Sequence, residues 1–428
     1  MNHDFEARMA PVVLTSVIVI AATSGVILRP FRWPEAVWAV LGAVALVLLG
    51  LLPLADAWRG VVKGFDVYLF LIGMMLLAEM ARIEGLFDWL ASFATAHADG
   101  SATRLYLLVY AVGTVVTVLL SNDATAIVLT PAVYAAARAA KVSNPLPYLL
   151  ICAFIANAAS FALPISNPAN LVVYGAGHMP PLATWLRIFL LPSVGAVLVT
   201  YIMLRFSQAH ALRSERLTSH APRPELSKGG MMAGIGIILA AIVLVCTSAF
   251  GFDLGLPTFV SGLICLITVL AATRRSPLDA LRGVSWSIIP LVAGLFVLVE
   301  ALQKIGIVHW LASTLDHNVA SSPQATAMLS GSLAALVSNL ANNLPVGLLA
   351  GGALRQAHAS SVAGAAVLIG VDLGPNLSVT GSLATILWLA ALRREGFAIT
   401  SWQFLKLGVV VMVPALTVAL ALLALESR

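Results

Sequence analysis

Long apolar stretches run from one end of this chain to the other, and they restrict its fold more than any other feature. Crossing the hydrocarbon core of a bilayer takes about 20 apolar residues per helix. By that measure the sequence predicts spanning helices at residues 10–28, 36–54, 66–81, 182–204, 230–250, 256–273, 286–303 and 403–425. Only 10% of the residues are charged, whereas a soluble domain carries about 25%. Lipid is therefore the main solvent, and the expected fold class is an all-α polytopic membrane protein.

What the sequence lacks argues against several classes of protein. It contains no GxxxxGK[ST] loop for ATP hydrolysis and no HExxH motif. Its three cysteines, Cys152, Cys246 and Cys265, have no CxxC spacing. The net charge of +5 occurs in short clusters between apolar stretches, which indicates membrane topology and not a nucleic-acid surface. We expect no cofactor, no metal centre, no nucleic-acid partner and no enzymatic activity, with membrane lipid as the surroundings.

The second half of the chain repeats the first at chemically distinctive positions. Asp56-Ala-Trp-Arg-Gly-Val61 recurs as Asp279-Ala-Leu-Arg-Gly-Val284, an offset of 223 residues. Further pairs, at offsets of 221 and then 217 residues, are Glu79 with Glu300, Gly85 with Gly306, Trp89 with Trp310, and Ser121-Asn122 with Ser338-Asn339. Leucine and alanine match by chance between any two apolar helices, but Arg, Glu, Trp and Asn in the same order do not. An internal repeat is indicated.

Each half also holds an apolar region that does not read as a plain span, at residues 105–177 and 324–392. Asn, Asp, Ser, Pro and Gly interrupt both regions, which predicts a re-entrant hairpin followed by a helix broken at mid-membrane. Each half then crosses the membrane five times, and an odd number inverts the second half relative to the first. The expected organisation is a first inverted repeat at 1–204, a cytoplasmic linker at 205–228 and a second inverted repeat at 229–428.

The distribution of positive charge predicts an orientation. If the linker faces the cytoplasm, 17 of the 24 Lys and Arg residues lie on the cytoplasmic side and the remaining seven lie outside. An excess of Lys and Arg marks cytoplasmic loops. The sequence therefore predicts ten spans with both termini outside.

Acidic residues at apparent membrane depth are Glu79, Asp123, Glu300 and Asp372. A carboxylate there costs at least about 2.5 kcal/mol, which makes each one a functional candidate. Glu79 and Glu300 occupy matching positions at the ends of their helices and are followed closely by Arg82 and Lys304, so snorkelling to the interface or an ion pair there explains them. Asp123 and Asp372 instead sit within dense polar runs, and we expect them to carry the coupling protons.

These polar runs supply the expected substrate-binding residues. Unpaired amides and hydroxyls are costly against lipid, so the runs must meet inside the protein. The alternative is that the same side chains only hold helices together. The expected substrate-binding residues are Ser121, Asn122, Thr125, Asn157, Ser166, Asn167, Asn170, Ser338, Asn339, Asn342, Asn343, Asn376, Ser378, Thr380, Ser382 and Thr385.

This set of side chains restricts the cargo. It is rich in amides, hydroxyls and carboxylates and poor in Lys and Arg, whereas an anion carrier is expected to place positive charge or helix N-termini against its substrate. Two carboxylates suit protons, a sodium ion or a neutral polyhydroxy solute. An ion gradient is the expected energy source.

Along essentially its whole length the chain resembles the ArsB-type arsenite/antimonite efflux permeases of the ion-transporter superfamily. The resemblance is carried by Leu120-Ser-Asn-Asp-Ala-Thr-Ala-Ile-Val-Leu-Thr-Pro131, Asn342-Asn-Leu-Pro345, Gly370-Val-Asp-Leu-Gly-Pro-Asn376 and Gly381-Ser-Leu-Ala-Thr385. It implies a bacterial inner-membrane protein with a scaffold domain, a transport domain and elevator-like motion. It also implies export of As(OH)3 or Sb(OH)3 in exchange for protons, and a soluble arsenite-stimulated ATPase as an optional partner.

Two other transport activities remain open on the residues alone. A sodium/proton antiporter would use Asp123, Asn157 and Asp372 equally well for Na+. A dicarboxylate symporter of the same superfamily would carry paired Ser-Asn-Thr hairpin motifs, which here read Ser121-Asn-Asp123 and Ser338-Asn-Leu340. The added negative charge argues against a dianion as cargo.

Overall fold

The computed structural model describes residues 2–175, 177–215 and 225–426, and over these ranges the ordered elements are helices, with no strand. Within this part of the chain, six helices are long and apolar enough to cross a membrane, or eight if each of two bent pairs forms one span. Many of their large apolar side chains are exposed, among them Ile20, Leu198 and Ile242, as expected of surfaces that face acyl chains. The chain is a multi-pass, all-α membrane protein, as the sequence predicts.

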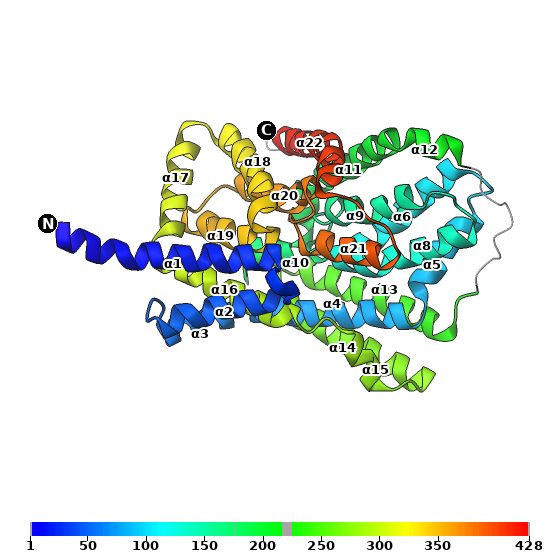
Figure 1. Ribbon diagram of the computed structural model, residues 1–428, viewed down its shortest axis with the longest axis horizontal. Helices are drawn as coiled ribbons and strands as arrows, with labels where there is room; N and C mark the ends of the chain where they lie inside the picture. The colour runs from blue at the N-terminus through cyan, green and yellow to red at the C-terminus, as the bar shows by residue number, and fades with distance from the viewer. Residues whose placement is uncertain (1, 176, 216–224, 427–428) are drawn as a thin grey trace.

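The first half consists of a long helix, a bent pair, a hairpin, a broken helix and a closing helix (Figure 1). Its elements are α1 (Asn2–Leu28), η1 (Pro30–Arg32), α2 (Glu35–Leu48), α3 (Leu54–Lys63), α4 (Phe65–Ile83), α5 (Leu86–Ala96), α6 (Ala102–Leu119), α7 (Asn122–Ala124), η2 (Thr125–Leu129), α8 (Thr130–Ala139), α9 (Leu146–Ala158), η3 (Pro164–Ser166), α10 (Pro168–Tyr174) and α11 (Leu182–Ser207). A short helix, α12 (Ala209–Ser214), follows.

The second half follows the same order. Its elements are α13 (Lys228–Ala249), α14 (Gly255–Thr273), α15 (Pro277–Gly283), α16 (Ile288–Lys304), α17 (Ile307–Ser321), α18 (Pro323–Ala341), α19 (Asn343–Gln356), α20 (Ser361–Leu373), η4 (Gly374–Leu377), α21 (Leu383–Arg394) and α22 (Ser401–Glu426). The bend between α3 and α4 is 46° and that between α15 and α16 is 41°. Gly85 and Gly306, each preceding an amphipathic helix, both have left-handed backbone, with φ of 74° and 87°, a conformation that favours glycine.

One predicted span is too long. The sequence predicts a helix over 36–54, but α2 ends at Leu48 and α3 begins at Leu54. Gly50 has a φ of 69° and Pro53 caps the next helix, so both residues stop the α-helix where hydropathy alone continues it. A 14-residue helix is about 21 Å long, shorter than the hydrocarbon core of about 30 Å.

One predicted repeat match has the wrong register. Ser338 and Asn339 lie inside α18, where their side chains donate to Ala334 O and Ala335 O one turn earlier. Ser121, by contrast, caps the helix after the hairpin tip by accepting from Ala124 N. The residue that does this in the second hairpin is Asn342, which accepts from Leu344 N. This capping position lies 221 residues after Ser121, the same offset as between Trp89 and Trp310, whereas the Ser-Asn match at 217 joins residues with different structural positions.

Both interfacial glutamates form ion pairs, but only Glu79 does so with the basic residue that follows it in sequence. Arg82 donates to both carboxylate oxygens of Glu79, at 2.8 and 2.6 Å. Glu300 instead accepts from Lys63 Nζ at 2.6 Å. Lys304 donates to Asp56 at 2.9 Å, so α3 is joined to α16 by two ion pairs across the halves. Glu300 and Lys304 of α16 therefore pair with residues of α3, from the other half of the chain, and not with each other.

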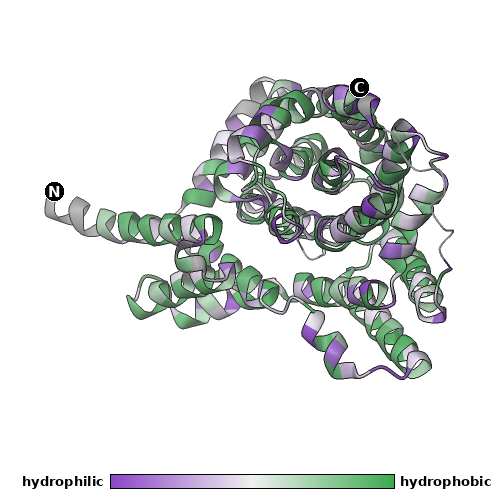
Figure 2. Cartoon of the chain, turned by 45° about the vertical axis from the view of Figure 1, so that its right-hand side comes forward, coloured by the Kyte–Doolittle hydropathy of each residue, from purple (hydrophilic) through white to green (hydrophobic). Residues whose placement is uncertain are grey.

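The helices form two groups that each draw on both halves of the chain. In one group α4 packs on α14 and α2 on α16, with α1, α3, α13 and α15 beside them. In the other, α18 packs on α20 and α11 on α22, with the hairpins and broken helices between them. Figure 2 shows the second group as a ring of largely hydrophobic helices around inner ones, with the first group to one side. The boundaries at 204 and 229 divide the sequence, not these spatial groups.

Three of the basic residues used for the orientation, Arg216, Arg223 and Arg428, lie outside the described residues. The orientation stays a prediction.

Candidate functional site

The first hairpin turns between α6 and α7, and its tip carries Asp123. Ser121 is extended and caps the short α7, and Asn122 Oδ1 accepts from Asp123 N at 2.9 Å. Thr125 is buried in the hairpin, where its hydroxyl lies 2.8 Å from that of Thr117. A π-helical turn over Thr125–Leu129 follows directly, a distortion that is frequent at functional sites. Asn122 and Thr125 therefore shape the tip, and Asp123 projects from it.

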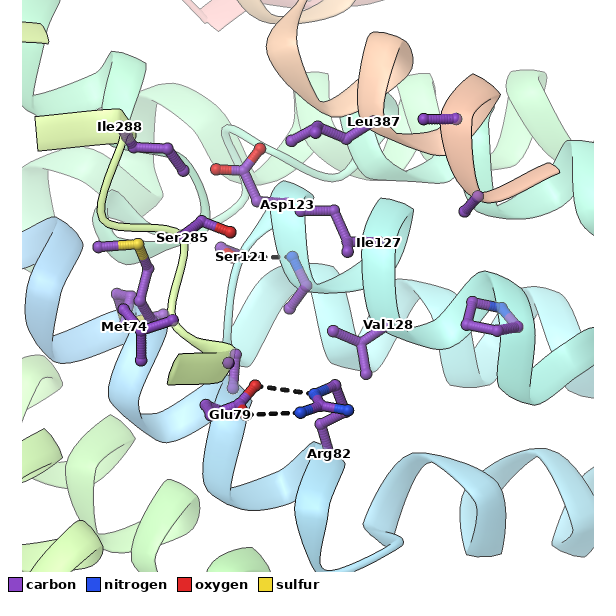
Figure 3. A pocket seen from close by; sticks show the side chains of 18 of the residues that line it. Met74, Glu79, Arg82, Ser121, Asp123, Ile127, Val128, Ser285, Ile288 and Leu387 are labelled. Carbon is purple, nitrogen blue, oxygen red and sulfur yellow. Dashed lines mark hydrogen bonds and ion pairs between the residues drawn. The ribbon is translucent and has the colours of Figure 1, made fainter. Parts of the chain in front are cut away.

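A cavity of about 450 Å³ lies in front of this tip, within the usual range for small-molecule sites. Its walls come from α4, the first hairpin, the start of α16 and the end of α21, with Pro168 at the start of α10. Figure 3 shows the Asp123 carboxylate pointing into the space between Ile288 and Leu387, with the Glu79–Arg82 pair on another wall. Among the described residues, no side chain donates a hydrogen bond to that carboxylate. The Asp123 side chain is half-buried, and its carboxylate is accessible to a solute in the cavity.

The cavity is more acidic than basic. Its lining includes Glu79, Asp123 and Glu395 against Arg82 and Arg394. Arg82 is neutralised by its bidentate ion pair with Glu79. Bidentate pairs of arginine and carboxylate are among the stronger hydrogen-bonded pairs in proteins. Within the described part of the chain, Arg394, at the end of α21, is then the one cation of this lining that forms no ion pair. This balance favours a neutral or cationic occupant over a multiply charged anion.

The second hairpin turns between α18 and α19, and its tip is bound to the break in the second broken helix. Asn339 Oδ1 accepts from Ser378 Oγ at 2.7 Å, and Thr380 Oγ1 donates to Asn339 O at 3.0 Å. Asn343 N donates to Gly381 O at 2.9 Å, and Asn342 Nδ2 lies 3.5 Å from Thr380 O. Polar side chains and backbone groups of the two interruptions thus satisfy one another, as burial in a membrane requires.

Asp372 lies in the last turn of α20 and has no exposed surface. Its two oxygens accept from Asn167 Nδ2 and Ser160 Oγ, both at 2.8 Å. Both donors belong to the break between α9 and α10, so the carboxylate joins the two broken helices. Asp372 does not line the cavity that contains Asp123.

Asn157 occupies the corresponding place in the first broken helix, at the end of α9. Its Nδ2 donates to Asn376 Oδ1 at 3.0 Å and to Thr385 Oγ1 at 3.2 Å, and its Oδ1 accepts from Ser382 Oγ at 3.2 Å. Ser382 caps α21, just as Asn167 caps α10. The contact between Asn167 and Asp372 is thus matched by the contact between Ser382 and Asn157. Ser382 lies 215 positions after Asn167, and Asp372 lies 215 positions after Asn157.

The structure brings the predicted residues into one buried polar layer but exposes few of them to a cavity. Ser166 donates to Val118 O at the first hairpin, and Asn170 Nδ2 donates to three carbonyls of the break beside it. Ser338 bonds within α18. Of the residues expected to bind substrate or protons, only Ser121 and Asp123 line the cavity. Hydrogen bonds among themselves hold most of the others.

Sequence reasoning missed part of the cavity wall. Met74 and Met75 of α4 line it, but they lie in a segment that reads as a plain apolar span. Ser285, which also lines it, lies in the connection before α16. Ser160, which donates to Asp372, is not among the expected site residues. No sequence signal distinguishes such residues, because their role depends on which helices face one another.

A second cavity of about 580 Å³ lies at the other end of the same groups, between α16, α10 and α19. Its lining includes Glu300, the counterpart of Glu79, together with Lys63 and Arg355. Arg355 donates to Val173 O and Tyr174 O at the end of α10, both at 2.9 Å, where a cation is favourable. Two cavities with corresponding linings therefore flank the polar layer.

Exchanging the charge between Asn167 and Asp372 tests what their contact does. Asn167→Asp alone places two carboxylates at a 2.8 Å contact, and we expect a lower thermal midpoint because like charges repel in a buried site. The double variant Asn167→Asp, Asp372→Asn restores one amide and one carboxylate, and most of the lost stability should return. Thermal unfolding of the detergent-solubilised protein measures both. A double variant no more stable than Asn167→Asp would show that the two residues are not coupled.

Comparison with known proteins agrees with this architecture. A family model described as citrate transporter matches residues 17–371. An arsenical pump membrane protein of Escherichia coli is 27% identical over 433 residues, covering 97% of each chain. One of Yersinia enterocolitica is 27% identical over 430 residues, again covering 97% of each. A putative arsenical pump membrane protein of Bacillus subtilis is 25% identical and covers 90% of this chain and 92% of its own.

A solved structure supports the same fold. The YdaH transporter of Alcanivorax borkumensis superposes with a TM-score of 0.60 at 12% sequence identity, covering 86% of each chain. At that identity the likeness is one of fold alone. With the family match over most of its length, the chain belongs to the citrate transporter family of membrane transport proteins.

Proposed function

We propose that this protein is a secondary active transporter that exports arsenite and antimonite, as neutral As(OH)3 and Sb(OH)3, in exchange for protons across the bacterial inner membrane. The observation that carries the proposal is the Asp123 carboxylate at a hairpin tip, open to a cavity of about 450 Å³. The names of the full-length relatives support the arsenical cargo.

The cavity chemistry supports a neutral, hydroxylated cargo. As(OH)3 presents three hydroxyl groups, and Asp123 and Ser121 offer oxygen acceptors and a hydroxyl donor within one lining. A thiolate cage would hold arsenic tightly, and Cys152 and Cys265 are buried away from this lining. A carrier must bind well enough to load and weakly enough to release.

In this proposal Asp123 exchanges protons in contact with the cargo, and Asp372 is a second proton site inside the polar layer. Asp372 has no cationic partner among the described residues, and a buried carboxylate without one is costly when charged. Proton uptake would change the contact between the two broken helices, since both oxygens of Asp372 accept hydrogen bonds from the break after α9.

We further propose that the halves are inverted repeats and that the group of hairpins and broken helices moves against the other group as an elevator. The recurring helix order, the similar bends of 46° and 41° and the exchanged contacts of Asn167 and Ser382 support the repeat. Cavities at both ends of the polar layer support alternate opening to the two sides.

The sodium/proton antiporter is the second candidate, because the Asp123 carboxylate is equally suited to a hard cation. Citrate, which the family's name mentions, suits this cavity less. A trianion would meet Asp123 directly, while Arg82 is already bound to Glu79.

Everted membrane vesicles from an arsenite-sensitive strain test the proposal. Arsenite and antimonite uptake should depend on the protein and on an imposed proton gradient, acid inside, and should collapse when a protonophore is added. The proton gradient should in turn be dissipated by added arsenite. Proton flux that depends on Na+ and not on arsenite would establish the antiporter instead.

A further inference from the structure

A basic groove lies at one end of α6 and α11, separate from the two cavities described above. Its volume is about 630 Å³, and α6, α11 and α12 form its walls. Each helix contributes one exposed arginine to the lining, namely Arg104, Arg205 and Arg213. All three belong to the side that the charge distribution assigns to the cytoplasm.

The groove keeps an excess of positive charge. Arg104 forms an ion pair with Asp99. Over the ranges that the structure describes, neither Arg205 nor Arg213 has a carboxylate within ion-pair distance. Glu215, two residues after Arg213, is used elsewhere, because its carboxylate accepts from Ser143 N at 2.7 Å and Ser143 Oγ at 2.8 Å. Two guanidinium groups are therefore available to an anion.

The remaining wall is apolar and preformed. Leu107, Ile202 and Phe206 line the groove and are exposed, Phe206 to 78%, on helices that face the bilayer. Tyr201 forms part of the lining, and its ring centroid lies 5.0 Å from that of Tyr110.

A link between the helices fixes this wall. The Tyr110 hydroxyl donates to Val197 O at 2.6 Å, which joins α6 to α11. The groove therefore does not need to form on binding.

We propose that this groove binds one anionic phospholipid of the adjacent leaflet. Arg205 and Arg213 would hold the headgroup phosphate, with Arg104 beside them, because guanidinium groups match phosphate geometry. The acyl chains would lie along Leu107, Ile202 and Phe206. Basic pockets between spanning helices on the cytoplasmic side take such headgroups, and the exposed apolar wall selects a lipid over a soluble anion.

Native mass spectrometry of the full chain in detergent tests this inference. Phosphatidylglycerol, cardiolipin and phosphatidylcholine are added at equal concentrations to the wild type and to the double variant R205Q, R213Q. The wild type should retain the anionic lipids in preference, and the variant should bind them roughly tenfold or more weakly. The matched control, R282Q with R393Q, removes two exposed arginines from α15 and α21 and should bind like the wild type.

Three results would overturn the inference. They are equal retention of phosphatidylcholine and phosphatidylglycerol by the wild type, equal loss in the control variant, and displacement of bound lipid by inorganic phosphate at millimolar concentration. The last would assign the groove to a soluble anion. Size-exclusion profiles and thermal midpoints of both variants, compared with the wild type, separate loss of binding from loss of folding.

Discussion

Proton-driven arsenite uptake into everted vesicles is expected to fall to the level of empty vesicles when Asp123 is replaced by asparagine. The amide keeps the size and much of the hydrogen bonding of the carboxylate but cannot carry a proton. Asp123 is the acid at the hairpin tip that opens into the cavity, and contacts to a charged group are worth about 1.5–3 kcal/mol. Loss of cargo binding alone would therefore cost tenfold or more, before the loss of coupling. Uptake of radiolabelled or mass-detected arsenite measures this effect.

Glu395→Gln is the matched control, because Glu395 lines the same cavity but follows α21 and does not belong to the hairpin. It should retain more than half of the wild-type uptake. Membrane insertion of both variants is checked by immunoblotting of the vesicles. If Asp123→Asn kept full resistance in an arsenite-sensitive cell, its role in proton exchange would be wrong, and Asp372 would be the remaining site to test.

Gly370→Ala is expected to disrupt the folded protein, because α20 meets α18 at this point without room for a methyl group. A Cβ on Gly370 would lie 2.0 Å from Gly331 O and 3.0 Å from Ala335 N. Both are backbone atoms of α18, so rotation of a side chain cannot relieve the clash. Overpacking of this kind costs about 1–3 kcal/mol and occasionally more. The shift of α20 would also displace Asp372, so both the thermal midpoint and arsenite export should drop.

Gly364→Ala gives the control on the same helix, since nothing beyond its own stretch of helix backbone lies within 4 Å of the added Cβ. Alanine is favoured over glycine inside a helix by about 0.5–1 kcal/mol, so this variant should be as stable as the wild type or slightly more stable. Fluorescence-detected thermal unfolding in detergent compares the two. Equal midpoints for Gly364→Ala and Gly370→Ala would mean that the close approach of α18 and α20 does not limit stability.

The overall plan was predictable from local sequence signals. Spans follow from runs of apolar residues, and interruptions follow from Asn, Ser, Pro and Gly, whose chemistry acts within a few residues. The helix interruptions of each half lie within the segments where those signals place them. The predicted span at 36–54 was too long because hydropathy does not register the helix stop at Gly50 and Pro53. Ser338 was matched to Ser121 because the residues are identical, although their structural positions differ.

The candidate site was predictable as a set of residues but not as a set of roles. Asp123 and Asp372 have similar sequence surroundings, yet one opens into a cavity and the other joins two broken helices. Glu300 has a lysine four residues later in sequence but bonds to Lys63 of the other half. Such pairings depend on which helices pack together.

The sequence by itself determined that this chain is a polytopic membrane protein with long apolar helices and polar interruptions in each half. Those properties follow from hydropathy and backbone chemistry along the chain, which lipid enforces residue by residue. Only the tertiary structure decided which polar side chains satisfy one another and which face a cavity, because a buried donor must find its acceptor in whatever helix lies opposite.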